Sequence, residues 1–237
     1  MRPRPVRDDF TVLLVADPPP QRPRPGGEGP AGRQEALVSL ARAVFAEGGR
    51  IALPADAGVA VTMATVALEY EGPRIAERRT EAGQQHRVLV VETERPQRDA
   101  RAFLAPFAAR GVVEYLDPDG DPVLLGLGEP ELFGEEGIRQ PVTPELLRLV
   151  RPRAVVLISS SNRSFRDLAV LRDSGVPVVA FGTTAHDRGT AADLSAVDDP
   201  TRDRWASRWS SERESRTVPY AFLMQDLVAR LTDRRGR

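Results

Sequence analysis

The sequence predicts a single α/β domain built on a parallel sheet of about five core strands with helices on both faces. Residues 154–158 and 177–181 form two almost entirely apolar runs, each followed by small polar residues. Continuous apolar runs of this kind are typical of strands covered on both faces. Helix-like stretches separate these runs and the earlier ones, and this alternation favours βαβ units with right-handed crossovers.

The first half of the chain shows this alternation of strand and helix. Apolar runs predict strands over 11–15, 51–53 and 87–91. Apolar residues at helical spacing predict a helix over 33–47, which Gly48-Gly49 should end, and another over 59–70. Proline, glycine and arginine dominate residues 18–32, which predicts a mobile loop instead of regular structure.

The second half continues the pattern with more irregular stretches. Residues 99–110 look helical, and Pro106 should kink or split that helix. Residues 112–125 are compatible with a hairpin around Asp119-Gly120. Thr143-Pro144-Glu145 has the features of a helix start, with a capping hydroxyl, a proline at the first position and an early acid. Two further helices are expected over 164–173 and from residue 217 to residue 231.

The domain is expected to span residues 10–232, with tails over 1–9 and 233–237. A chain of 237 residues can bury a sizeable core in one such unit. Residues 187–217 are dense in alternating charges and form a variable segment inside the domain. Trp205 and Trp209, four residues apart, are expected to dock this segment onto the core.

Composition excludes several classes of protein. The net charge of -1 gives no bulk field for nucleic acid or an anionic membrane, so neither is expected as a partner. All 33 basic residues are arginine, which excludes a P-loop lysine and a Schiff-base lysine. The absence of cysteine excludes disulfides and thiolate catalysis. His86 and His186 lack metal-ligand spacing, so no metal and no bound cofactor are expected.

Targeting and catalytic motifs are also missing. The N-terminus has no apolar leader and no apolar stretch is long enough to span a bilayer, which predicts a cytoplasmic protein. The sequence contains neither G-x-G-x-x-G after the first strand nor a P-loop, and neither H-E-x-x-H nor G-x-S-x-G. Dinucleotide-fingerprint, P-loop, zincin and α/β-hydrolase functions are therefore not predicted.

The loops that follow the strands should meet at the carboxyl edge of the sheet, where open α/β sheets bind ligands. Hydroxyls and helix N-terminal amides there could hold a phosphate. The residues predicted to contact the ligand are Asp17, Ser159, Ser160, Ser161, Asn162, Gly182, Thr183, Thr184 and His186.

Three strand-end carboxylates, Asp56, Glu92 and Glu94, are the candidates for acid, base or nucleophilic catalysis. Each of these assignments has a plainer alternative. Strand-end carboxylates are often only solvated, and Ser159 to Asn162 would also suit the cap of the helix that follows.

The order of elements resembles the SLOG superfamily, the Rossmann-like group related to the Smf/DprA and LOG proteins. The likeness covers most of residues 10–232 and includes Gly182-Thr183-Thr184-Ala185 and the late Val218-Pro219-Tyr220 helix. It is nearest to the bacterial branch found beside defence genes, and it implies a site for nucleotides or nucleotide-derived molecules. This chain has Pro54-Ala55-Asp56 in place of the family's Gly-Gly turn and Ser159 to Asn162 in place of glycines and an acid. It lacks the hydrolase signature P-G-G-x-G-T-x-x-E.

Three functions follow as hypotheses. The first is binding or sensing of a nucleotide-like phosphorylated ligand, and the second is hydrolysis of a nucleotide N-glycosidic bond, as in a phosphoribohydrolase. The third is a scaffold with a vestigial pocket, in which the helix over 217–231 packs against a second copy to form a homo-oligomer.

Overall fold

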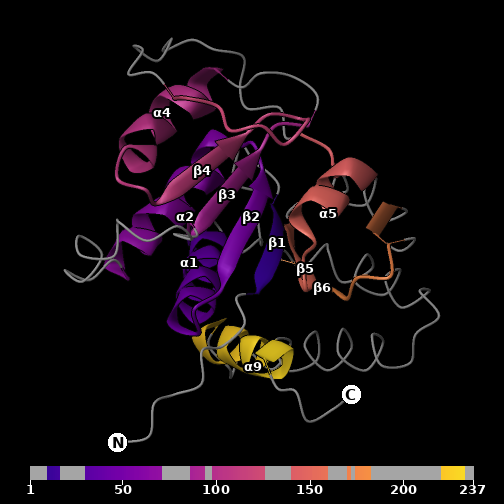
Figure 1. Cartoon of the computed structure of the whole chain (residues 1–237). Coiled ribbons are helices and arrows are strands. Elements are labelled where there is room, and N and C mark those ends of the chain that lie inside the picture. Colours follow the sequence, from indigo (N-terminus) through magenta and orange to yellow (C-terminus); the bar gives the residue numbers. More distant parts are fainter. Residues whose placement is uncertain are drawn as a thin grey trace, which may run out of the picture.

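A computed structural model describes residues 10–16, 30–70, 86–93, 98–125, 140–159, 170–171, 174–182 and 220–232. Within these residues, six strands form one parallel sheet in the order β4-β3-β2-β1-β5-β6, with helices around it (Figure 1). The α/β class is therefore confirmed, with one strand more than the predicted five. The strands are β1 (Thr11–Ala16), β2 (Arg50–Pro54), β3 (Val88–Val91), β4 (Val113–Leu116), β5 (Ala154–Ser159) and β6 (Val178–Gly182).

The described helices cover both faces of this sheet. They are α1 (Pro30–Ala46), α2 (Ala57–Glu69), α4 (Arg98–Ala108), α5 (Pro144–Val150) and α9 (Tyr220–Thr232). Helices α1, α2, α4 and α9 share one apolar cluster with alternate strand residues, and we call this side the first face. Helix α5 packs with the intervening strand residues on the second face. All six residues of β1 are buried, as the continuous apolar run predicted.

Glycine ends α1 where the sequence predicted it. The amide of Gly49 donates to the carbonyl of Val44 and that of Gly48 to the carbonyl of Phe45, the two bonds of a Schellman motif. Gly48 has a φ of +82°, a conformation that favours glycine. A Cβ on Gly49 would lie 2.5 Å from the Phe10 ring, so this glycine lets the ring pack against the turn before β2.

Three details differ from the predictions. Helix α1 begins at Pro30, inside the stretch predicted as loop, because proline suits the first position of a helix. Pro106 lies inside α4 but does not split it, since the helix runs unbroken from Arg98 to Ala108. Residues 112–125 contain a parallel strand and a turn with a single antiparallel bridge, Leu116 to Pro122, instead of a hairpin of two strands.

Several predicted segments fall outside the described residues. These are the two tails, the charged segment 187–217 and most of the helix expected over 164–173. In the part of the chain that is described, no helix combines the length and the apolar character that crossing a membrane requires.

Helix α9 is fixed to the first face by a buried stripe. Tyr220, Met224, Leu227, Val228 and Leu231 belong to the same cluster as α1, and Leu227 is fully buried. We expect Leu227→Ala to lower the free energy of unfolding by about 2–5 kcal/mol, because it removes buried methyl groups and leaves a cavity. Leu124 is 98% exposed, so Leu124→Ala should change stability by less than about 0.5 kcal/mol. Urea unfolding of both variants checks this, and equal losses would contradict the docking of α9.

Candidate functional site

Strand order places a change of direction between β1 and β5. The crossover from β1 to β2 contains α1 on the first face. The crossover from β5 to β6 includes Val170, Leu171 and Val176, which pack on the second face with α5. The described parts of these two crossovers therefore lie on opposite faces of the sheet. This is the topological switch point, the place where open α/β sheets bind ligands.

The register shows which residues reach this point. Ala16 pairs with Ile158, and Ser159 pairs with Gly182, so β1, β5 and β6 end at neighbouring levels. Ser159 is the last residue of β5 and Gly182 the last residue of β6. The other ligand-binding residues predicted from the sequence lie outside the described residues: Asp17, Ser160, Ser161, Asn162, Thr183, Thr184 and His186.

Asp56 leaves the sheet next to the switch point, at the end of β2. Its side chain caps α2, because Oδ1 accepts a hydrogen bond of 2.8 Å from the amide of Val59. The side chain is only partly buried. Asp56 therefore caps α2, and its carboxylate still lies at the carboxyl edge of the sheet.

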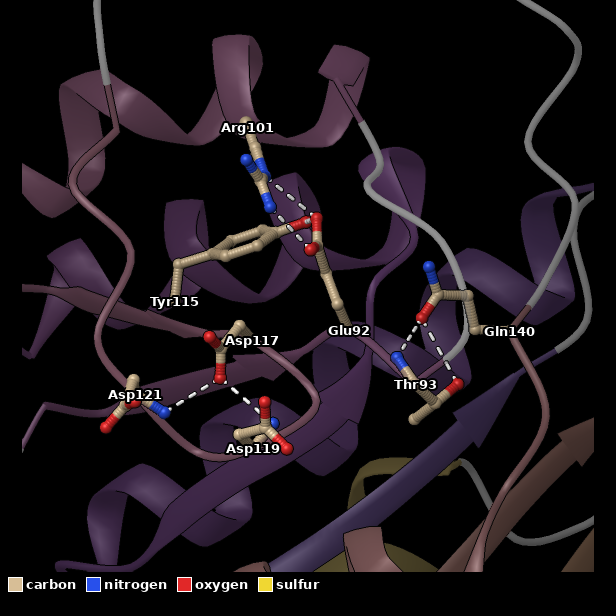
Figure 2. A network of polar contacts seen from close by, with 8 residues as sticks. All are labelled: Glu92, Thr93, Arg101, Tyr115, Asp117, Asp119, Asp121 and Gln140. Atoms are coloured by element: carbon tan, nitrogen blue, oxygen red, sulfur yellow. Dashed lines mark hydrogen bonds and ion pairs between the residues drawn. The ribbon is translucent and has the colours of Figure 1, made fainter.

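Glu92 has a different environment at the end of β3 (Figure 2). Its carboxylate accepts hydrogen bonds of 2.8 Å and 2.6 Å from Nε and Nη2 of Arg101 and one of 2.8 Å from the hydroxyl of Tyr115. Glu92 is 1% exposed. It continues the alternation of Val88 and Val90, so its side chain lies on the first face beneath α4. Two strands separate β3 from β5, and the bonds of Glu92 point away from the switch point.

The pKa values follow from this arrangement. The hydrogen bond to Glu92 raises the pKa of Arg101, and ionic attraction to the same carboxylate adds to the effect. Burial raises the pKa of Tyr115 far above its ordinary value, and the hydrogen bond to Glu92 raises it further. The network therefore consists of a neutral phenol, a guanidinium and a carboxylate, a charge-assisted arrangement suited to holding α4 and β4 together.

A second contact covers the end of β3. Oε1 of Gln140 accepts hydrogen bonds from the amide of Thr93 and, at 3.2 Å, from the hydroxyl of Thr93 (Figure 2). The Thr93 hydroxyl also lies 3.0 Å from the carbonyl of Pro141, to which it can donate. Gln140 is buried and precedes α5. On the next strand, Asp117 Oδ1 accepts from the amides of Asp119 and Asp121 and closes a turn. The ends of β3 and β4 are thus occupied by contacts within the protein.

The catalytic candidates therefore lie apart. Asp56 and Glu92 follow neighbouring strands, but only Asp56 is next to β1, and Glu94 lies outside the described residues. The sequence analysis did not single out Arg101, Tyr115 or Gln140. The period-two alternation Val88, Val90, Glu92 could have placed the carboxylate on a buried face, although its partners depend on how α4 docks.

No metal-binding cluster is found among the described residues. Among the described residues, no group of three or more histidine, aspartate or glutamate side chains could hold a metal ion. Comparisons of the chain with protein-family models, with curated proteins and with solved structures find no match. The SLOG resemblance therefore stays a prediction, and the fold and the strand ends carry the functional proposal.

The buried ion pair can be compared with an exposed one of similar geometry. Arg101→Ala should cost about 3 kcal/mol of stability, because it leaves a carboxylate buried without its cation. Glu92→Gln should cost less, because the side chain of Arg101 is 32% exposed and can be hydrated. Arg42 and Glu69 form two bonds of 3.0 Å on the surface, so Arg42→Ala should cost far less than Arg101→Ala. Urea unfolding measures all three, and equal losses for the two arginines would contradict a structural role for Glu92.

Tyr115 should make stability depend on pH in the alkaline range. Its folded pKa lies above the ordinary value of 10.0, so the folded state keeps a proton that the unfolded state loses. The contribution is present below about pH 10 and declines above it by about 1.4 kcal/mol per pH unit. Tyr115→Phe should cost about 1–3 kcal/mol near neutrality, and this difference should shrink above about pH 10. Denaturant unfolding across this range checks it, and a pH-independent difference would contradict it.

Proposed function

We propose that this chain binds a nucleotide or nucleotide-derived phosphorylated ligand at the carboxyl edge of its sheet. The observation that carries the proposal is the switch point between β1 and β5, with β6 ending beside it. Ligands of open α/β sheets bind outside the carboxyl ends of the strands at such a point. The sequence beyond these ends is rich in small polar residues, Ser160 to Asn162 after β5 and Thr183-Thr184 after β6.

Charge gives the ligand an orientation in this proposal. Asp56 places a carboxylate on the β2 side of the switch point, where it would repel a phosphate. The β5 and β6 side carries hydroxyls and glycine, which suit a phosphate because they offer donors and close backbone approach. We therefore place the phosphate beside Ser159 and Gly182. The sugar lies toward Asp56, since carboxylates accept hydrogen bonds from ribose hydroxyls in related geometries.

The contacts of the acidic residues favour binding over hydrolysis. An N-glycosidic hydrolase needs a carboxylate that can reach the anomeric carbon. Glu92 is bonded to Arg101 and Tyr115 and is buried, and Asp56 accepts from the amide that it caps. Glu92 is therefore fully engaged within the fold, and Asp56 shares its carboxylate with the cap of α2. Binding or sensing is therefore the function that we put forward, and hydrolysis is an outcome of the test.

A nucleotide panel tests the proposal. NAD, ADP-ribose and nucleoside mono-, di- and triphosphates are added to the full chain, and thermal unfolding is followed. A ligand present at about a hundred times its dissociation constant should stabilise the folded state by about 2.7 kcal/mol. Gly182→Val should abolish this gain by adding bulk at the end of β6, and Ser159→Ala should weaken it. Unchanged melting curves across the panel would overturn the proposal.

Two controls separate binding from other effects. Ser39→Ala makes the same chemical change as Ser159→Ala but lies within α1, so the response to ligand should be unchanged. Release of free base from the same nucleotides is measured chromatographically with the wild type and with Asp56→Ala, Glu92→Ala and Glu94→Ala. Base release that depends on one of these acids would replace the binding function with the hydrolase.

A further inference from the structure

The amino edge of the sheet, opposite the proposed ligand site, contains a depression with an unusual lining. Its volume is about 520 Å³, within the range of small-molecule sites. It lies where β1 and β2 begin, beside the end of α5. The residues that line it are four arginines, Arg50, Arg148, Arg151 and Arg153, together with Phe10, Thr11, Leu149 and Val150.

Two of these arginines flank Thr11 in the sheet. Thr11 pairs with Arg50 on one side, and the amide of Arg153 donates to the carbonyl of Thr11 on the other. Because Val12, Ile51 and Ala154 lie on the first face, strand alternation places the three preceding side chains on the second face. Neighbouring strands lie about 4.8 Å apart, so the backbones of Arg50 and Arg153 are roughly 10 Å apart, with Thr11 between them.

The other two arginines come from the end of α5, which covers the same face. Arg148 lies in the last turn, and Arg151 caps the helix with a left-handed φ of 46°. Both positions also suit the negative end of the helix. The interaction with the helix end explains Arg148 and Arg151. It does not explain Arg50, at the start of β2, or Arg153, directly before β5. The four side chains come from three separate parts of the fold and share one depression.

Few anionic groups balance this charge. The lining contains no carboxylate. Of these four arginines, only Arg148 has an acidic partner among the described residues, Glu145 at 3.6 Å on the surface. Nε of Arg50 is buried and makes no hydrogen bond. The whole chain has a net charge of -1, so the cluster does not reflect an overall excess of positive charge. Several cations around one concave surface attract an anion and favour its binding.

We propose that this depression is a second ligand site, which binds the phosphate groups of a small phosphorylated molecule. Guanidinium groups bind phosphate through paired, charge-assisted hydrogen bonds, and four of them around one depression favour a ligand with more than one negative charge. Thr11 lies between Arg50 and Arg153 in the sheet, and its hydroxyl can donate a further bond. This site is separate from the proposed nucleotide site, because it lies at the opposite end of β1.

Inorganic pyrophosphate is the probe for this site, and isothermal titration at low ionic strength is the measurement. The double variant Arg50→Gln/Arg153→Gln should lose about ten-fold or more in affinity, because charge-assisted bonds are removed. Arg42→Gln is the matched control, since it removes a guanidinium on α1 outside the depression. Absence of binding by the wild type, or equal affinities in the double variant and the control, would overturn the site.

A second double variant tests the site even if the Arg50→Gln/Arg153→Gln variant does not fold. Arg148→Gln/Arg151→Gly changes two exposed residues, and glycine suits the left-handed conformation at Arg151. It should weaken pyrophosphate binding while circular dichroism and stability stay near those of the wild type. A folded variant with unchanged affinity would count against the proposal even if the Arg50 variant did not fold.

A comparison of ligands separates the two sites. ADP and adenosine are titrated beside pyrophosphate, since the phosphate could be free or part of a nucleotide. Equal affinity for pyrophosphate and ADP at the arginine site indicates recognition of phosphate alone, and tighter binding of ADP indicates a nucleotide. Ser159→Ala should leave pyrophosphate binding unchanged. If ADP binding is lost in Ser159→Ala and pyrophosphate does not bind, the second site fails and the carboxyl-edge site stands.

Discussion

Strand β1 is hydrogen bonded on both sides and covered on both faces, and the rest of the fold is arranged around it. Strands β2, β3 and β4 extend the sheet in one direction, while β5 and β6 extend it in the other. All of its residues are buried, from Thr11 at 6% exposure to Ala16 at 7%. Its carboxyl end marks the switch point, and its amino end carries the threonine of the arginine depression. Six residues of strand span roughly 20 Å, which is the scale of the separation between the two proposed sites.

Polar contacts at the ends of β3 and β4 limit which part of the carboxyl edge can hold the proposed nucleotide. Glu92 is held by Arg101 and Tyr115 under α4, and the end of β3 is covered by the contact of Thr93 with Gln140. These contacts occupy polar groups at the ends of β3 and β4. The proposed ligand site therefore lies between β2 and β6, where Asp56 is the carboxylate among the described residues and two strands end in Ser159 and Gly182.

The sequence predicts the fold well where burial on both faces produces continuous apolar runs. Strands β1, β2, β3, β5 and β6 are predicted in this way. Strand β4 was missed as a parallel strand because Glu114 interrupts its apolar run and the Asp117 turn follows directly. The start of α5 was also predicted, and Thr143 accepts a hydrogen bond from the amide of Leu146 as the residue pattern indicated. Helix caps and buried strands depend on residues that are close together in the chain, so short sequence patterns predict them.

The two polar clusters could not be predicted because their members meet only after folding. Arg101 reaches Glu92 once α4 docks, and Arg50 and Arg153 become neighbours because β1 lies between β2 and β5. About a hundred residues separate these two arginines in the chain, so no local motif could reveal the cluster. The two clusters also differ physically. The carboxylate of Glu92 is neutralised by its own protein and stabilises the fold. The arginines at the amino edge have almost no such partner among the described residues, and this imbalance distinguishes a structural ion pair from a site that attracts a ligand.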